Sequence, residues 1–368
     1  MNDAKENGPE VGTTKTLRKT DELIKLGFID KKRRTEIDEV SENFSTAITP
    51  EMANLINKNN IKQDPIANQF VPTANELDVK QEELNDPIGD DFYTSVKGII
   101  HRYPDRCLFK PVNVCPIYCR FCFRREKVGP GNEGLTPAEL EVAYSYISNH
   151  PEIWEVIFTG GDPLIMKPKT LTKILENLSL IDTVDVIRMH TRVPVVDPSV
   201  INSAMIDALK CCRQPVTIVL HANHAKEFTK SACDAIAQLV DNGIMMLGQS
   251  VLLSNVNDNI EALSELMRCF IKNRVKPYYL HHGDLAVGTS HFRTSIEKGQ
   301  SLMYQLRGRF SGICQPTYVL DIPGGYGKVP ISHNYINQTE SSKDSYIVED
   351  YQGGFHQYCD LLSHSGRS

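Results

Sequence analysis

The chain has 368 residues, of which 40% are hydrophobic and 23% are charged, and its formal net charge is −6. This composition is ordinary for a globular protein, and the slight acidic excess excludes bulk attraction to nucleic acid or to a membrane surface. No apolar run approaches the roughly 20 residues that span a bilayer. The first ten residues, MNDAKENGPE, lack the apolar core of a signal peptide, so we expect a cytoplasmic protein.

Residues 1–90 predict a polar N-terminal helical extension, rich in Lys, Glu, Asp and Asn. Within it, SENFSTAITPEMANLINKNN predicts two helices interrupted at Thr49-Pro50, because proline suits the first turn of a helix. We expect residues 1–15 to be disordered.

Six short runs rich in β-branched or aromatic residues follow within residues 91–300, the range that we expect to form the core. They are CLFKPVNVC (107–115), WEVIFTG (154–160), VDVIRMH (184–190), PVTIVLHA (215–222), MMLGQSVLL (245–253) and VKPYYLHH (275–282). After the first interval, successive runs begin about 30 residues apart, which is the length of a strand, a helix and a return strand. Such apolar strands indicate a parallel sheet covered by helices. The spacing leaves open a closed eight-stranded barrel, an open six-stranded barrel and a doubly wound sheet.

Polar or unusual residues follow nearly every one of these runs. They are Cys115, Thr159–Asp162, His190–Arg192, His221–His224, Ser254–Asn255 and His281–Asp284. In a barrel such strand ends converge on one site, whereas a doubly wound sheet has a single crevice. The pattern therefore favours an α/β fold built as a partial (βα)6, TIM-like barrel.

Three of the ten cysteines, Cys115, Cys119 and Cys122, form a C-x3-C-x2-C motif with three arginines close by. A zinc site made of two C-x2-C pairs would need a second pair, and the next cysteine is 89 residues further on. Three inert buried thiols would not suit so charged a loop. An iron–sulfur cluster with three protein ligands and one open iron fits this spacing best. We expect the other seven cysteines to be small buried hydrophobic residues.

A second unusual stretch is DIPGGYGKVPI (321–331), in which Lys328 follows a glycine-rich turn. It departs from the phosphate-binding loop G-x4-G-K-[ST], because Val329 follows the lysine. A lysine presented in this way can form a Schiff base with a carbonyl cofactor. From its residues alone, a solvated loop lysine is the more common reading of such a segment.

The cysteine motif, at the end of the first predicted barrel strand, closely resembles the signature of the radical S-adenosylmethionine superfamily. The resemblance implies a 4Fe–4S cluster on the three cysteines, with S-adenosylmethionine on the open iron. The turn TGGDP (159–163) resembles the Gly-Gly-acidic turn of that superfamily. Residues Gly160, Gly161 and Asp162 are thereby expected to bind S-adenosylmethionine.

Several motifs in order resemble the lysine 2,3-aminomutase family, whose members combine radical chemistry with pyridoxal phosphate. They are GIIHRYPDRCLF, the cysteine loop, FTGGDPL, HTRVPVV, GQSVLLSNVND, YYLHHGDLAVGTSHFRT and DIPGGYGKVPI. The resemblance covers about residues 85 to 335. It implies that a C-terminal segment, 301–368, carries pyridoxal phosphate on Lys328 as an internal aldimine.

The family resemblance also implies the reaction. The substrate amine displaces Lys328, a 5'-deoxyadenosyl radical removes the C3 hydrogen of the external aldimine, and the nitrogen migrates to the neighbouring carbon. The chain is thus expected to be an isomerase that converts L-lysine to β-lysine, with an external one-electron reductant as its partner.

Charge complementarity and the family pattern together assign the substrate contacts. Arg124 matches the family's carboxylate-binding arginine, since a guanidinium fork suits a carboxylate. Asp284 and Asp321 match its pair of ammonium-binding aspartates, which favour lysine over glutamate because desolvated like charges are costly. Arginine as substrate stays open. More loosely, the family pattern places Arg102, Tyr103 and Arg106 against substrate or pyridoxal phosphate.

The chain departs from longer family members, which carry a C-terminal cysteine-containing extension that binds structural zinc. Cys359 is the one cysteine beyond Cys314, so we expect no structural zinc, and among homo-oligomers a dimer is favoured. In length the chain resembles a branch that supplies β-lysine for modification of elongation factor P, but it keeps the Asp-x-Pro-Gly-Gly-x-Gly-Lys form that this branch lacks. A catalytically inactive, zinc-binding interaction protein is the alternative from another functional class.

Overall fold

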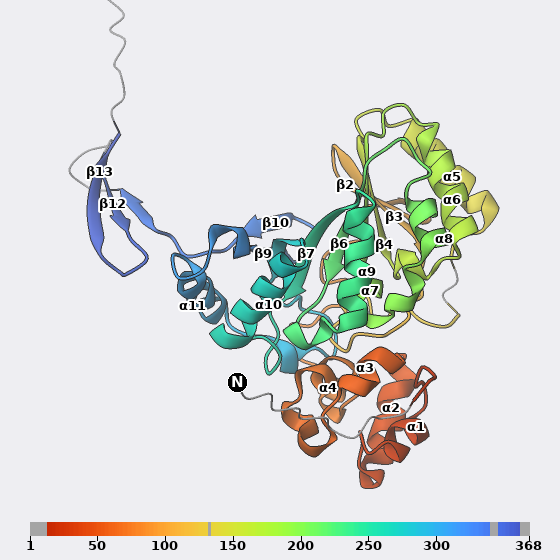
Figure 1. Cartoon of the computed structure of the whole chain (residues 1–368), viewed down its shortest axis with the longest axis horizontal. Coiled ribbons are helices and arrows are strands. Elements are labelled where there is room, and N and C mark those ends of the chain that lie inside the picture. The colour runs from red at the N-terminus through yellow and green to blue at the C-terminus, as the bar shows by residue number, and fades with distance from the viewer. Residues whose placement is uncertain (1–12, 132–133, 339–344, 361–368) are drawn as a thin grey trace, which may run out of the picture.

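A ten-stranded sheet, whose strands are neighbours in chain order, forms the centre of the molecule (Figure 1). The computed structural model describes residues 13–131, 134–338 and 345–360. The strands are β1 (Thr94–Val96), β2 (Ile99–Tyr103), β3 (Arg106–Val112), β4 (Glu155–Gly160), β5 (Val186–Thr191), β6 (Val216–His221), β7 (Met245–Val251), β8 (Lys276–His281), β9 (Thr317–Ile322) and β10 (Gly327–Pro330). Strands β3 to β9 run parallel, and β1, β2 and β10 add antiparallel edges. In the described residues the first and last strands do not pair, so the barrel is open.

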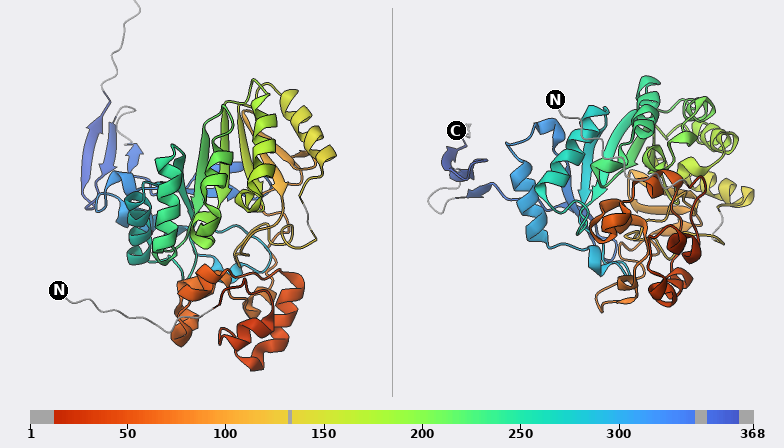
Figure 2. Two further views of the ribbon diagram at one scale, coloured as in Figure 1. Left: turned by 45° about the vertical axis from the view of Figure 1, so that its right-hand side comes forward. Right: turned by 60° about the horizontal axis from the view of Figure 1, so that its bottom comes forward.

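Helices follow each of the strands from β3 to β8 and cover the outer face of the sheet (Figures 1 and 2). They are α5 (Pro137–Ser148), α6 (Pro168–Ser179), α7 (Val193–Val196), α8 (Ser203–Leu209), α9 (Lys230–Asp241), α10 (Ile260–Lys272) and α11 (Ile296–Leu306). This confirms the predicted (βα)6 barrel, and all six predicted runs form strands. The structure adds a seventh parallel strand, β9, which the sequence analysis did not identify.

Alternating side chains divide each strand between the core and the inside of the barrel. In β5, Ile187 and Met189 are fully buried, whereas Arg188 and His190 are partly accessible and line an internal cavity. This is the period of two that a strand imposes on its side chains. The apolar set faces the covering helices, which leaves the inner set free for polar residues.

The N-terminal helices pack below the barrel, at the end where the parallel strands terminate (Figures 1 and 2). They are α1 (Thr20–Lys25), α2 (Arg34–Asn43), α3 (Pro50–Leu55) and α4 (Pro65–Phe70). Helix α3 begins at Pro50 as predicted, and the Thr49 hydroxyl accepts a hydrogen bond from the Met52 N–H. The preceding helix ends at Asn43, earlier than the sequence indicated. Most of the segment predicted to be disordered, residues 1–12, lies outside the described residues.

Glu76 joins this N-terminal segment to the loop that carries the three cysteines. Its fully buried carboxylate accepts hydrogen bonds from Arg120 (Nη2 to Oε2, 2.5 Å; Nε to both oxygens, 3.0 Å) and from Arg125 Nη2. Burial alone would raise the pKa of Glu76, but the two guanidinium groups outweigh it and lower the pKa. Two of the loop's arginines are therefore structural.

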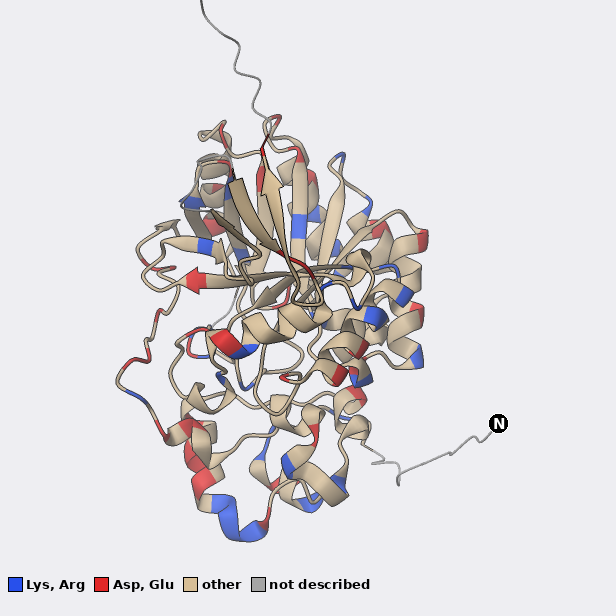
Figure 3. Cartoon of the chain, turned by 90° about the vertical axis from the view of Figure 1, so that its left-hand side faces the viewer, with Lys and Arg blue, Asp and Glu red and all other residues tan. Residues whose placement is uncertain are grey.

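A small antiparallel sheet lies beyond β10 and extends away from the barrel (Figure 1). Its strands are β11 (Ile336–Gln338), β12 (Ser345–Glu349) and β13 (Phe355–Cys359). Acidic and basic residues are interspersed over the outer helices and the N-terminal segment (Figure 3). Across the described ranges, no helix combines the length and the apolar character that a membrane crossing requires.

Replacing Glu76 by Gln should lower the free energy of unfolding by about 3–5 kcal/mol, because two buried guanidinium groups would lose their carboxylate. Urea denaturation followed by circular dichroism measures the change. Glu39→Gln, an exposed site in α2, is the control and should leave the transition unchanged. Equal midpoints for the two variants would contradict the assigned role of Glu76.

Candidate functional site

One cavity of about 760 Å³ opens inside the barrel, where the C-terminal ends of the parallel strands meet. Every site residue proposed from the sequence lines it: Arg102, Tyr103, Arg106, Cys115, Cys119, Cys122, Arg124, Gly160, Gly161, Asp162, Asp284, Asp321 and Lys328. They come from both edges and the middle of the sheet, so it is the curvature of the open barrel that brings them together. The volume lies in the upper part of the roughly 300–1,000 Å³ range of ligand pockets.

The three thiols of the cysteine loop lie at one end of this cavity, directly after β3. Burial raises the pKa of all three, that of Cys122 to about 11, and each nearby thiolate would raise the pKa of Cys115 further. Arg192 Nη1 donates a hydrogen bond to Cys119 Sγ over 3.0 Å and opposes this effect. Among the described residues lining the cavity there is no further cysteine. Three soft ligands therefore converge where a cation would have to displace their protons.

Arg124 differs from the two structural arginines of the same loop because it points into the cavity. Its Nε and Nη2 donate to Asp90 Oδ2 over 3.0 and 2.8 Å, and its Nη1 donates to Thr159 Oγ1 over 3.3 Å. Burial alone would raise the pKa of Asp90, but Arg124 outweighs it and lowers the pKa. The sequence analysis missed Asp90, whose one signal was the acidic end of NDPIGDD (85–91).

The Gly-Gly-Asp turn after β4 holds the cysteine loop in place. A Cβ on Gly161 would lie 2.3 Å from the Val114 carbonyl oxygen, so only glycine permits this approach. The Asp162 carboxylate accepts hydrogen bonds from Thr191 Oγ1 (2.6 Å) and from the Arg192 N–H (2.8 Å). Its side chain thus fixes the end of β5, and the Gly161 and Asp162 N–H groups hold the cysteine loop by donating to the Val112 and Val114 carbonyl oxygens.

Lys328 lies on β10 directly opposite Asp321 on β9. Lys328 Nζ is 2.5 Å from Asp321 Oδ2, and the Lys328 N–H donates to Tyr103 Oη over 2.9 Å. The preceding Gly327 has a φ of +90°, and a Cβ there would lie 2.7 Å from Tyr103 Oη. The glycine-rich turn thus lets the lysine strand approach β2 and directs the ammonium group at a buried carboxylate.

Asp284 follows β8 and completes this end of the cavity. Within the described part of the chain its carboxylate makes no hydrogen bond. Its pKa is raised to about 7, first by burial and then by the negative charge of Asp321, while Lys328 and Arg124 act in the opposite direction. The positive charge of Lys328 therefore acts on the carboxyl groups of both Asp321 and Asp284.

Cationic groups surround the space between the cysteines and Lys328. Arg102 donates to Asp90 over 3.1 Å and lies 3.8 Å from Asp321, and the Arg106 guanidinium stacks 3.9 Å from the centre of the Tyr103 ring. Buried polar atoms at the cavity have no hydrogen-bond partner among the described residues: Arg102 Nε, Arg188 Nε, His190 Nε2, Arg192 Nε and Asp321 Oδ1. Buried polar groups are rarely left unsatisfied, so this set indicates a polar ligand. The sequence analysis placed His190 and Arg192 among the polar strand ends expected to converge but gave them no individual role, and it did not single out Arg188.

Comparisons with known proteins identify the relatives of this chain. A family model described as lysine-2,3-aminomutase matches residues 303–361. An L-lysine 2,3-aminomutase of Methanococcus maripaludis is 39% identical, over 92% of this chain and 78% of that one. The enzyme of the same name from Clostridium subterminale is 36% identical, over 94% and 82%.

Two further similarities are to a relative named for a different amino acid and to a solved structure. A glutamate 2,3-aminomutase of Clostridioides difficile is 37% identical, over 90% of this chain and 78% of that one. Among solved structures, a radical SAM methyltransferase from Sphaerobacter thermophilus is 16% identical, with a TM-score of 0.43, over 60% of this chain and 68% of that one. On the sequence relatives, which it matches over most of their length, this chain belongs to the lysine 2,3-aminomutase family.

Proposed function

We propose that this chain is an L-lysine 2,3-aminomutase, which moves the α-amino group of L-lysine to C3 and yields β-lysine. The observation that carries the proposal is the place of the Lys328 ammonium group, 2.5 Å from Asp321 and within the field of Asp284. This primary ammonium on a four-carbon stem is the same chemical group that a lysine substrate would present. The chain's own lysine thus stands in for the distal end of the substrate.

The same two carboxylates argue against an acidic substrate. A glutamate side chain would bring a third negative group towards Asp284 and Asp321 in a site shielded from water, at a large desolvation cost. The raised pKa of Asp284 already reflects repulsion between the two residues present. An alkylammonium relieves this repulsion, so the charge of the site favours lysine over glutamate. A guanidinium group would relieve it too, and arginine is therefore included in the test below.

The cysteine loop fits a 4Fe–4S cluster with one open iron, because three thiols converge and the described lining of the cavity offers no fourth. When bound, the cluster and S-adenosylmethionine supply the radical that removes a hydrogen atom from the substrate. Cys115, Cys119 and Cys122 would hold the cluster, and Arg192 would favour the thiolate of Cys119. The backbone of Gly160 to Asp162 borders this space and would receive the polar end of S-adenosylmethionine.

Lys328 fits as the residue that would hold pyridoxal phosphate. The cofactor, when bound, supplies a conjugated system through which nitrogen can move between adjacent carbons. Arg102 and Arg106 give that end of the cavity the positive charge that a phosphate requires, and Tyr103 lies between Arg106 and the Lys328 backbone. The unpaired Nε of buried Arg102 supports such an anionic ligand.

Arg124 is proposed to bind the substrate carboxylate, with Asp90 as its positioning residue. Asp90 occupies the Nε–Nη2 edge of the guanidinium group. A guanidinium group has five N–H donors in a planar fork, so after the bonds to Asp90 and Thr159 one N–H on Nη1 and one on Nη2 remain for a ligand. Pairing with Asp90 also fixes the plane of the Arg124 guanidinium group before substrate arrives. The proposal further includes a cytoplasmic, homodimeric enzyme that takes its electron from an external reductant.

Anaerobic reconstitution with iron, sulfide and pyridoxal phosphate, followed by reduction and S-adenosylmethionine, should give an enzyme that converts L-lysine to β-lysine. Chromatography that resolves α- from β-amino acids measures the product. L-arginine and L-glutamate should be recovered unchanged, and omission of S-adenosylmethionine should abolish turnover. Conversion of arginine or glutamate with lysine left unchanged would overturn the substrate assignment, and zinc with no iron-dependent activity would overturn the enzyme assignment.

Borohydride reduction of the loaded protein should attach pyridoxal phosphate to Lys328, because this amine faces the phosphate-binding end of the cavity. Peptide mass spectrometry locates the adduct. Lys328→Ala should lose the adduct and keep the absorption of the iron–sulfur cluster. Lys230→Ala, at an exposed site in α9, should keep both. An adduct on another lysine in the unaltered protein would refute the assignment.

Lysine should bind about tenfold more tightly at about pH 8 than at about pH 6, because an ammonium ligand requires Asp284 in its ionised form and its pKa is about 7. Below about pH 7 Asp284 is protonated, and it must lose this proton before it can pair with an ammonium group. Binding of lysine is therefore weaker at the lower pH. The KM for lysine across this range measures the effect. Asp284→Asn should flatten the profile, and Asp234→Asn, at an exposed site in α9, should preserve it. A persistent slope in Asp284→Asn would assign the titration to another group.

A further inference from the structure

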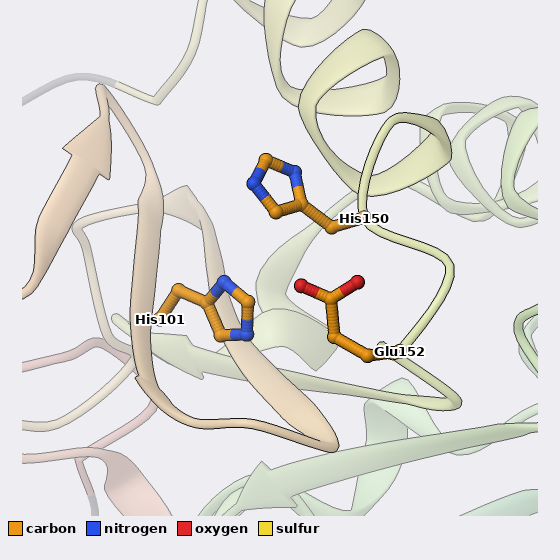
Figure 4. Close-up of side chains that lie close together, drawn as sticks. All are labelled: His101, His150 and Glu152. Atoms are coloured by element: carbon orange, nitrogen blue, oxygen red, sulfur yellow. The ribbon is translucent and has the colours of Figure 1, made fainter.

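A second cluster of potential ligands lies on the outer side of the sheet, away from the cavity. His101 of β2 meets His150 and Glu152, which follow α5, and their candidate ligand atoms lie within 4.8 Å of one another. The three side chains point towards one another (Figure 4). Neighbouring residues of a strand face opposite sides, so Arg102 lines the cavity while His101 faces α5.

The hydrogen bonds of His101 fix which of its ring nitrogens is free. Its Nδ1 lies 3.0 Å from Tyr146 Oη, and Tyr146 Oη donates its proton to Ser95 Oγ over 3.0 Å. The phenol oxygen must therefore accept from Nδ1–H, which leaves a lone pair on Nε2. That Nε2 is buried and has no hydrogen-bond partner in the described residues. A buried imidazole with a bare lone pair needs a proton donor or a metal ion.

His150 has the same arrangement. Its Nδ1 lies 2.7 Å from the Tyr146 carbonyl oxygen, which can only accept, so Nδ1 carries the proton and Nε2 the lone pair. The ring also stacks on Tyr146 at 3.9 Å between centroids, which limits its rotation. Metal-binding histidines commonly donate their second N–H to a carbonyl or similar acceptor in this manner. Both imidazoles are thus held in the ligand form by one tyrosine.

Glu152 supplies the charge. Its carboxylate is exposed and makes no hydrogen bond within the described ranges, so it can move the short distance that coordination requires. Two imidazoles and one carboxylate form a neutral-plus-anionic donor set that suits a borderline divalent cation.

We propose that His101 Nε2, His150 Nε2 and a Glu152 oxygen bind Zn²⁺, with water as the fourth ligand. The ion would tie β2 to the end of α5 and so steady the strand that carries Arg102. This site differs in place and in ligands from a site built on C-terminal cysteines, so the expected absence of that zinc does not bear on it.

Titration of Zn²⁺ into the chelator-treated protein, with its iron–sulfur cluster reconstituted so that the three thiols are occupied, tests the proposal by calorimetry. One Zn²⁺ should bind per chain. His150→Gln and Glu152→Gln should each weaken binding at least about 100-fold, and Tyr146→Phe about 10- to 100-fold through the lost acceptor of His101. Because Glu152 is exposed, its variant should fold normally.

Two matched controls keep the same residue types elsewhere. His356→Gln, on β13, and Glu141→Gln, exposed on α5, should bind Zn²⁺ like the unaltered protein. Zinc-edge X-ray absorption should show nitrogen and oxygen neighbours without sulfur. The proposed site would be refuted if Zn²⁺ did not bind, or if His150→Gln and Glu152→Gln bound Zn²⁺ as tightly as the unaltered protein does. Sulfur neighbours of the zinc in the absorption spectrum would refute it too, whatever the activity of the enzyme.

Discussion

The structure depends on the pairing of buried cations with carboxylates that reach them from distant segments. Glu76 holds two arginines of the cysteine loop, Asp90 holds Arg124 and Arg102, and Glu227 accepts from Arg192 over 2.5 Å. Isolated charges at these depths would cost several kcal/mol each, so each must have its partner for the barrel mouth to form. The N-terminal segment is therefore part of the site, because it supplies two of these carboxylates.

This pairing also explains how one loop can serve two purposes. Arg120 and Arg125 are used to anchor the loop, and Arg124, between them and the cavity, keeps an edge for a ligand. The anchor lies within a few residues of the cysteines, so the three thiols are held in place before any metal arrives. Preorganisation of this kind reduces the ordering cost of assembling a cluster.

Much of the barrel could be predicted from local patterns, because apolar runs at regular spacing are encoded residue by residue. Strand β9 was not predicted, because the end of its sequence TYVLDI overlaps the start of the glycine-rich stretch at Asp321 and Ile322. The three cysteines stood out through their spacing and Lys328 through the glycine-rich turn before it, and all four line the same cavity. Asp90 was missed, and Arg192 was placed at a strand end without a role, because their partners lie 34 and 73 residues away and no local pattern records such pairs. Likewise, the sequence motif identified Asp162, but its hydrogen bonds to Thr191 and Arg192 depend on how the strands associate.

The ion pair between Lys328 and Asp321 has a consequence for the order of events. While Lys328 is a free amine, it occupies the carboxylates on which a substrate ammonium would depend, so the unloaded protein blocks its own site. Attachment of a carbonyl cofactor to this amine would take Lys328 out of the ion pair and release Asp321. Cofactor and substrate would then favour each other's binding through a shared carboxylate, a reciprocal coupling that needs no change in the fold.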